Sequence, residues 1–141
     1  MRRRDQYFSQ MAMEEARKSY MNQKHGCVII HNDKEVVAQG FNHDMCTMND
    51  VNSIHAEVSA INQLRKILKT NKDKNFVQRC KLYVVRVGSP IMNYPMKNSK
   101  PCEHCTKSIF KMGIPTVYYS TDDEYLEVLE SLRHRRPISS A

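Results

Sequence analysis

The sequence is short of the features that would place it outside the ordinary class of globular domains. Its 141 residues include only four glycines and five prolines, and they contain no internal repeat and no low-complexity segment. Hydrophobic residues make up 40% of the chain, but no run of them is long and apolar enough for a membrane span or a signal-peptide core. These absences indicate one soluble, cytoplasmic domain, 1–141, with room for a real core.

Cysteine is scarce and unevenly placed. The chain has five cysteines, and only Cys102 and Cys105 lie close together in the sequence. An odd number without regular pairs does not indicate a disulfide framework, and in a reducing compartment the close pair indicates a metal or catalytic site. We expect Cys27, Cys46 and Cys80 to be small buried or loop residues.

Acidic residues are fewer than basic ones. The chain has 22 Lys and Arg against 15 Asp and Glu, a net charge of +7. This excess favours an anionic partner, but it does not distinguish a nucleotide from a nucleic acid. Part of it lies at the two ends of the chain, which predicts basic, solvated tails at about 1–4 and 134–141.

The spacing of apolar residues predicts the elements of an α/β domain. Helices are predicted at 5–20, 54–69, 102–113 and 122–133, with Asp5 and Ser53 as candidate N-caps of the first two. Strands are predicted at 26–30, 35–38, 82–85 and 116–119, the first two as a hairpin around an Asn-Asp turn. Segments 42–53 and 88–100 are expected to be loops. Strands and helices alternate in the second half, which indicates a layered fold with a mixed sheet.

Two short motifs carry the chemistry. His55 and Glu57 would point about 200° apart within a helix, so both can serve one site only from a helix start. Cys102 and Cys105 share one face at another predicted helix start, where the helix dipole favours thiolates and a cation. If the two starts face each other, His55, Cys102 and Cys105 form an open zinc site with a position left for water. Glu57 then moves the proton of that water.

A closed structural site is the competing interpretation. His43 and Cys46 are also three residues apart, and with Cys102 and Cys105 they would complete a Cys3His zinc site. That arrangement leaves His55 without a function. The absence of any metal is the remaining alternative.

The two motifs together resemble the signature of the zinc-dependent cytidine and deoxycytidylate deaminase superfamily: His55-Ala56-Glu57, followed by Pro101-Cys102-x-x-Cys105. The resemblance covers most of residues 5–120. Segment 26–29 is similar to the family's first strand, 40–42 to its glycine-x-asparagine segment, 55–61 to the deoxycytidylate deaminases, and 113–119 to the stretch after the cysteines. It implies the cytidine-deaminase-like three-layer α/β/α sandwich.

The resemblance also implies a reaction. It gives His55, Cys102 and Cys105 as zinc ligands, Glu57 as the proton shuttle and Asn42 as a ribose contact; Ala56 and Lys100 are further candidates for contact with the substrate. The implied reaction is hydrolytic deamination of a cytosine nucleotide or nucleoside, deoxycytidylate-like, with release of ammonia. The alternatives are a polynucleotide deaminase, acting on tRNA adenosine or single-stranded nucleic acid, and a non-catalytic zinc-stabilised binding module. A homo-oligomer without a membrane partner is expected.

The chain departs from the family pattern in two places. Residues 88–100 are an insertion before the cysteines, expected near the mouth of the active site, where Lys97 and Lys100 would place positive charge near a substrate phosphate. The family's sheet tends to have a fifth strand, but little sequence follows Arg133. We therefore expect this strand to be short, missing or supplied differently.

Overall fold

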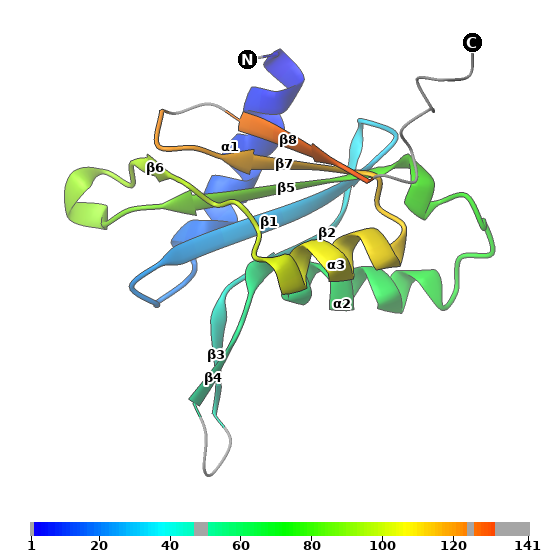
Figure 1. Cartoon of the computed structure of the whole chain (residues 1–141), viewed down its shortest axis with the longest axis horizontal. Helices are drawn as coiled ribbons and strands as arrows, with labels where there is room; N and C mark the ends of the chain where they lie inside the picture. Colours follow the sequence, from blue (N-terminus) through cyan, green and yellow to red (C-terminus); the bar gives the residue numbers. More distant parts are fainter. Residues whose placement is uncertain (1, 47–50, 124–125, 132–141) are drawn as a thin grey trace.

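The computed structural model describes residues 2–46, 51–123 and 126–131, without the side chains of 44–46 and 51–53. At its centre is a six-stranded sheet (Figure 1). Five of its strands lie side by side in the order β2 (Glu35–Phe41), β1 (Lys24–His31), β5 (Cys80–Val87), β7 (Thr116–Ser120) and β8 (Leu126–Glu130). The short strand β6 (Met96–Lys97) pairs with the end of β5. Strands β5 and β7 run parallel and the other neighbours antiparallel, so the sheet is mixed, as predicted.

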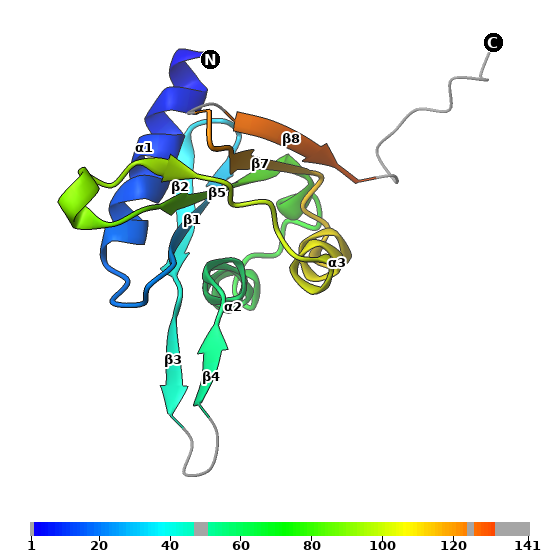
Figure 2. The same ribbon diagram turned by 60° about the vertical axis from the view of Figure 1, so that its left-hand side comes forward.

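Helices cover both faces of the sheet. Helix α1 (Arg3–Arg17) lies on one face, and α2 (Ala56–Leu68) and α3 (Glu103–Met112) lie side by side on the other (Figure 2). This arrangement confirms the predicted three-layer α/β/α sandwich. No helix in the described part of the chain has the length and apolar character needed to cross a membrane.

Strand β1 supplies both cores because its side chains alternate between the two faces. Cys27 and Ile29 pack toward α2 and α3, whereas Val28 and Ile30 pack toward α1. Gly26 faces α1 so closely that a Cβ atom there would overlap the backbone of the helix. A residue with a side chain at this position would therefore force α1 away from the sheet.

Strands β1 and β2 form the predicted hairpin. The turn residues Asn32 and Asp33 have φ values of 54° and 56°, the left-handed conformation that tight two-residue turns require and that Asn and Asp tolerate. The Asp33 carboxylate pairs with Lys81 at 2.7 Å, which fixes the turn to the start of β5.

Helix α1 begins earlier than predicted, at Arg3. Asp5, predicted as its N-cap, lies instead in the first turn and accepts a hydrogen bond from the Tyr83 hydroxyl at 2.6 Å. Arg4 pairs with Asp33 at 3.2 Å. The predicted basic tail at 1–4 is therefore partly helical, and the other predicted tail, 134–141, lies outside the described residues.

The predicted helix at 122–133 is wrong, because the described part of this segment contains strand β8, antiparallel to β7. Leu126 and Leu129 have the three-residue spacing of a helical stripe, but the same spacing puts one leucine on each face of a strand. Leu126 packs against the core under α1, and Leu129 packs against the other core. Pairing with β7, which would otherwise be an open edge, decides between the two conformations. The expected fifth strand is thus supplied differently, by 126–130.

The predicted loop at 42–53 contains two short strands, β3 (His43–Cys46) and β4 (Val51–Ile54). They pair with each other and not with the central sheet, and they project from the body of the molecule (Figure 1). Their pairing depends on the partner strand, which an irregular polar sequence does not reveal. Helix α2 then begins at Ala56 with His55 as its N-cap, so the predicted cap at Ser53 is wrong.

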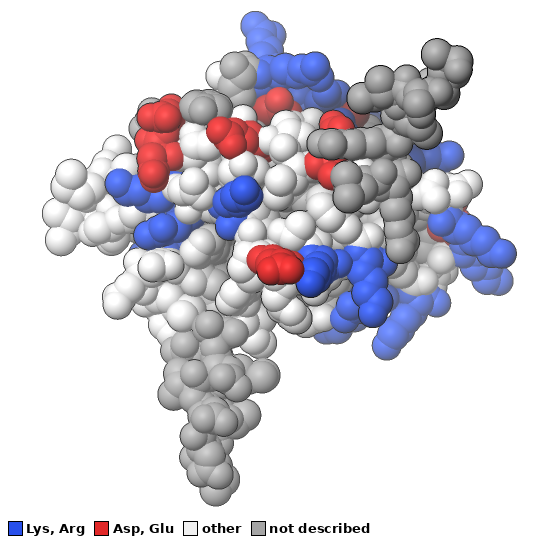
Figure 3. Space-filling model, in the orientation of Figure 1, with Lys and Arg blue, Asp and Glu red and all other residues white. Residues whose placement is uncertain are grey.

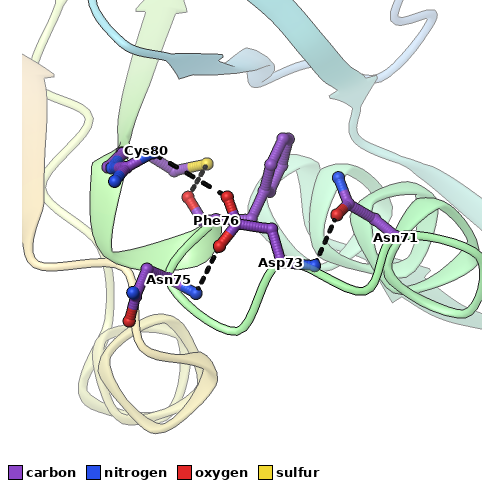
Figure 4. A network of polar contacts seen from close by, with 6 residues as sticks. Asn71, Asp73, Asn75, Phe76 and Cys80 are labelled. Carbon is purple, nitrogen blue, oxygen red and sulfur yellow. Dashed lines mark hydrogen bonds and ion pairs between the residues drawn. The ribbon is translucent and has the colours of Figure 1, made fainter.

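The charged link between α2 and β5 is an ordered series of turns (Figure 4). The Asn71 side chain accepts from the Asp73 N–H, and the Asp73 side chain accepts from the Asn75 N–H, each at 2.9 Å. Phe76 then enters the core, where its ring stacks on His31 at 4.0 Å. These contacts hold the start of β5, the central strand that leads to the insertion and to α3.

Candidate active site

The starts of α2 and α3 meet, as the sequence predicts. His55 is the N-cap of α2 and Cys102 the N-cap of α3, and the His55 Nδ1 atom lies 3.1 Å from the Cys105 Sγ atom. One donor atom from each of His55, Cys102 and Cys105 lies within 4.8 Å of the other two. Among the described residues, this is the one group of His, Cys, Asp and Glu side chains close enough to hold a metal ion.

The chemistry of the group suits zinc. An imidazole nitrogen and two sulfurs are a typical zinc donor set, and three protein ligands leave one tetrahedral position open. Both cysteines lie at the start of α3, where the helix dipole favours negative charge. Burial, followed by the charge of Glu57, raises the pKa of the Cys105 thiol well above its usual range. A bound cation reverses this preference, because it stabilises the thiolate directly.

The closed-site alternative is not supported by the position of His43. This residue does not belong to the group around the cysteines, and its ring lies against Phe41, with centroids 5.9 Å apart. The side chain of Cys46 lies outside the described residues. Cys27 and Cys80 are fully buried in β1 and β5, as predicted.

Glu57 lies in the first turn of α2 and is only 4% exposed. Burial is the largest influence on it and raises the pKa of its carboxyl above the usual value. A carboxyl group that holds a proton more readily near neutral pH is suited to accept and return one during a reaction.

A pocket of about 630 Å³ opens over these helix starts. This volume is in the range of small-molecule sites. Six of the residues predicted for the site line it: Asn42, His55, Ala56, Glu57, Lys100 and Cys102. The seventh, Cys105, is buried next to them.

Asn42 has a clear structural task in the pocket wall. Its Oδ1 accepts from the His25 N–H at 2.8 Å, and its Nδ2 donates to the Gln23 carbonyl at 2.6 Å. These bonds hold the segment before β1 against the end of β2. The second amide N–H donates to the Met21 sulfur at 3.5 Å, so a lone pair of Oδ1 is what the amide keeps for a ligand.

Sequence reasoning missed His25 and Ser99, which also line the pocket. His25 lies on the same face of β1 as Cys27, and burial, with the Arg86 charge next, lowers the pKa of His25 to about 4. The imidazole is therefore neutral at pH 7. The available signal was position: His25 directly precedes the family-like strand at 26–29, and Ser99 comes three residues before Cys102.

The insertion 88–100 is only partly at the mouth of the pocket. Its middle turns back over α1, where the Arg17 guanidinium lies 4.8 Å from the centre of the Tyr94 ring. Of the insertion, Ser99 and Lys100 are the residues that line the pocket, and Lys97 is not among them. Lys100 is therefore placed to meet a substrate in the pocket, whereas the expected nearness of Lys97 to a substrate phosphate stays a prediction.

One group of positive charge on this face of the molecule lies away from the pocket. Figure 3 shows a group of Lys and Arg side chains over the ends of α2 and α3, whereas the starts of these helices meet at the pocket. Basic residues in or just after the last turns include Lys66, Lys69 and Lys111. Such positions favour cations because of the helix dipole, so this charge has a structural reason.

Comparison with known families agrees with the geometry. A family model described as the cytidine and deoxycytidylate deaminase zinc-binding region matches residues 2–121. The chain therefore belongs to the cytidine and deoxycytidylate deaminase family. Its activity is that of a zinc-dependent hydrolytic deaminase.

Solved structures share the fold at low sequence identity. Cytidine deaminase from Burkholderia pseudomallei is 19% identical, with a TM-score of 0.62 over 92% of this chain and 93% of that one. The dCMP deaminase of cyanophage S-TIM5 is 21% identical, with a TM-score of 0.56 over 84% of each chain. Cytidine deaminase from Mycobacterium leprae is 19% identical, with a TM-score of 0.57 over 87% of this chain and 91% of that one. A comparison with curated protein sequences finds no match.

Proposed function

We propose that His55, Cys102 and Cys105 hold zinc and that the pocket deaminates a small cytosine nucleotide. Deoxycytidylate is the preferred substrate and the free nucleoside comes next. The observation that carries this proposal is one pocket of about 630 Å³ with buried Glu57 at the zinc-binding group and exposed Lys100 at the rim. The likeness of 55–61 to the deoxycytidylate deaminases points the same way.

A zinc ion held by His55, Cys102 and Cys105 would supply Lewis acidity, which makes a water molecule acidic enough to react near neutral pH. The Glu57 carboxylate accepts a proton from that water and passes it to the ring nitrogen beside the attacked carbon. Glu57 then takes the remaining proton from the added hydroxyl group and passes it to the amino group, which leaves as ammonia when its bond to the ring carbon breaks. In sum, cytosine and water become uracil and ammonia, and Glu57 returns to its starting state.

The other pocket residues orient the substrate. Lys100 carries an ammonium group at the rim, where it pairs with a nucleotide phosphate. The Asn42 amide oxygen accepts a hydrogen bond from a sugar hydroxyl through its second lone pair, and His25 presents a neutral ring on the same wall. Among the described residues that line the pocket, Glu57 and Lys100 are the two that belong to the Asp, Glu, Lys and Arg class.

The charge at the rim can be tested by removing one lysine at a time. Lys100→Ala is expected to raise KM for deoxycytidylate about tenfold, because a contact with a charged group is lost, and to leave deoxycytidine unaffected. Lys97→Ala is the matched control: this lysine is exposed in the same insertion but does not line the pocket. Equal effects of the two variants would show that Lys100 makes no specific contact with the phosphate.

The net charge of +7 favours a polynucleotide as the alternative substrate. Ammonia release from deoxycytidylate, deoxycytidine and cytidine is therefore compared with deamination of a single-stranded oligonucleotide and of tRNA, at low and moderate salt. Contact with many phosphates weakens steeply as salt rises, whereas contact with one phosphate weakens little. Activity confined to the polymers, with a steep salt dependence, would overturn the proposal.

A further inference from the structure

Two buried serine hydroxyls meet where β5 and β7 separate. Ser99 is 2% exposed and Ser120 is fully buried, and their Oγ atoms are 2.7 Å apart. The parallel pairing of the two strands extends to Val84 and Tyr119. Ser99 enters beside the carboxyl ends of these strands, the edge at which open α/β sheets place their ligands.

The two hydroxyls bond the backbone groups that the separating strands leave unpaired. Ser99 Oγ donates to the Val84 carbonyl at 2.8 Å and accepts from the Ser120 N–H at 2.7 Å. Ser120 Oγ accepts from the Arg86 N–H at 3.1 Å, and its one proton is shared between the Lys97 carbonyl at 2.6 Å and Ser99 Oγ at 2.7 Å. Buried backbone groups without partners are costly. The serine pair therefore fixes the end of the insertion to both strands at once.

Lys100 directly follows this anchor. Its backbone N–H donates to the Asn98 side chain at 2.9 Å, and the Asn98 N–H donates to the exposed Asp122 carboxylate at 3.0 Å. The backbone of Lys100 is thus fixed by two contacts: the anchored residue Ser99 that precedes it, and the hydrogen bond from its own N–H to the Asn98 side chain. Its exposed side chain stands at the pocket rim.

We propose that the Ser99–Ser120 pair is a positioning device for Lys100 and so sets the preference for phosphorylated over unphosphorylated substrate. This inference rests on the proposed function of the pocket. The pair acts on Lys100 and not on the metal ligands, because Cys102 is held separately by α3. The Cys102 carbonyl accepts from the Thr106 N–H and hydroxyl, each at 2.9 Å.

The test compares Ser99→Ala and Ser120→Ala with the parent chain, loaded with zinc, on deoxycytidylate and deoxycytidine. Each variant is expected to lower kcat/KM for the nucleotide about tenfold through KM, because a contact with a charged group is weakened. Ser120→Ala, which changes a residue outside the pocket lining, leaves the nucleoside rate unchanged, and both variants keep their zinc. Calorimetry gives a second readout: affinity for the product deoxyuridylate falls, while affinity for deoxyuridine does not. Ser89→Ala is the matched control, since this exposed hydroxyl also bonds a backbone N–H, that of Ile91, in the same insertion.

A double variant separates positioning from general destabilisation. If the serines act through Lys100, adding Ser99→Ala to Lys100→Ala causes no further loss for the nucleotide. The inference is overturned if the serine variants lose kcat/KM equally for deoxycytidylate and deoxycytidine. It is also overturned if Ser99→Ala lowers kcat/KM for deoxycytidylate as much in the Lys100→Ala chain as in the parent chain.

Asp122→Ala removes only the exposed bond to the Asn98 N–H, so it tests the same segment without a change in the core. Asp122→Ala is expected to lower kcat/KM for deoxycytidylate less than the serine variants do, and to leave the rate for deoxycytidine unchanged. If it does not lower kcat/KM for deoxycytidylate at all, the inference is also overturned. A parent chain that releases ammonia from neither substrate contradicts the proposed function itself, which is a separate result.

Discussion

The two helices that meet at the pocket begin in opposite ways. At the start of α3, the Cys102 sulfur accepts a hydrogen bond from the Cys105 N–H at 3.4 Å, so the helix is capped by its own side chain. At the start of α2, the His55 side chain makes no such bond, and its ring lies against Cys105 instead. The first N–H groups of a helix need partners from outside it. The start of α3 is thus capped by one of its own sulfurs, whereas the side chain at the start of α2 faces the other sulfur, that of Cys105.

The first turns of the two helices also differ in how they carry an acidic residue. Glu57 in α2 is buried, whereas Glu103 in α3 is exposed and pairs with Lys107 at 3.0 Å. Both carboxylates are placed favourably for the helix dipole. Burial beside the metal-binding group, and not position in the helix, is therefore what distinguishes the Glu57 carboxyl from the solvated one of Glu103.

The largest expected effect follows from removing a sulfur at the start of α3. Cys102→Ala should lose bound zinc and with it all turnover, because two remaining ligands bind the metal poorly. Metal analysis of the purified chain measures the loss directly. Cys46→Ala and Cys80→Ala are the controls and should keep a single zinc ion per chain. If Cys46→Ala loses zinc as readily as Cys102→Ala, the closed structural site is correct.

The next effect concerns the buried carboxyl of α2. Glu57→Ala should keep zinc and fold but lose turnover by roughly 10²–10⁴-fold or more, since one residue handles several proton transfers. Glu103→Ala changes the corresponding exposed carboxyl of α3 and should leave the rate unchanged. A Glu57→Ala chain within about tenfold of the parent rate contradicts the mechanism and favours a zinc-stabilised binding module.

The site was predictable from the sequence because its signals are local. The His55-Ala56-Glu57 motif and the three-residue spacing of Cys102 and Cys105 each predict the start of a helix. Together they predict which side chains could bind a metal ion. Features that depend on distant partners were not predictable. Strand β8 exists because β7 offers an edge, and the Ser99–Ser120 pair joins residues 21 positions apart. The bonds of Asn42 to the segment before β1 are of the same kind.

A third prediction tests what holds α2 in place. Gly40 in β2 lies so close to α2 that a Cβ atom there would be 2.7 Å from the Ser59 Cβ and 2.8 Å from the Ala60 nitrogen. Gly40→Ala should lower the free energy of unfolding by about 1–3 kcal/mol, as overpacked cores do. It should also lower turnover, because the helix start carries His55 and Glu57.

Urea unfolding of the zinc-loaded chain and a rate assay measure these two effects of Gly40→Ala. Gly88→Ala is the comparison, since its Cβ would meet the Pro95 ring and the Lys97 side chain in the insertion and no atom of α2. A Gly40→Ala chain as stable as the parent would show that α2 is free to move away from β2.

The smallest effect is expected at the second contact between α2 and β2. The Gln63 side chain accepts from the Gln39 N–H at 2.6 Å on the exposed edge of the sheet. Gln63→Ala should cost only about 0.5–1 kcal/mol of unfolding free energy, because water replaces an exposed hydrogen bond at little loss. Turnover and zinc content should be unchanged, since this bond lies two turns from His55. Asn62→Ala, at the exposed neighbouring position, is the control for helix propensity. If Gln63→Ala lowers turnover while Asn62→Ala does not, the edge bond also sets the position of the helix start, and Gly40 is not its main determinant.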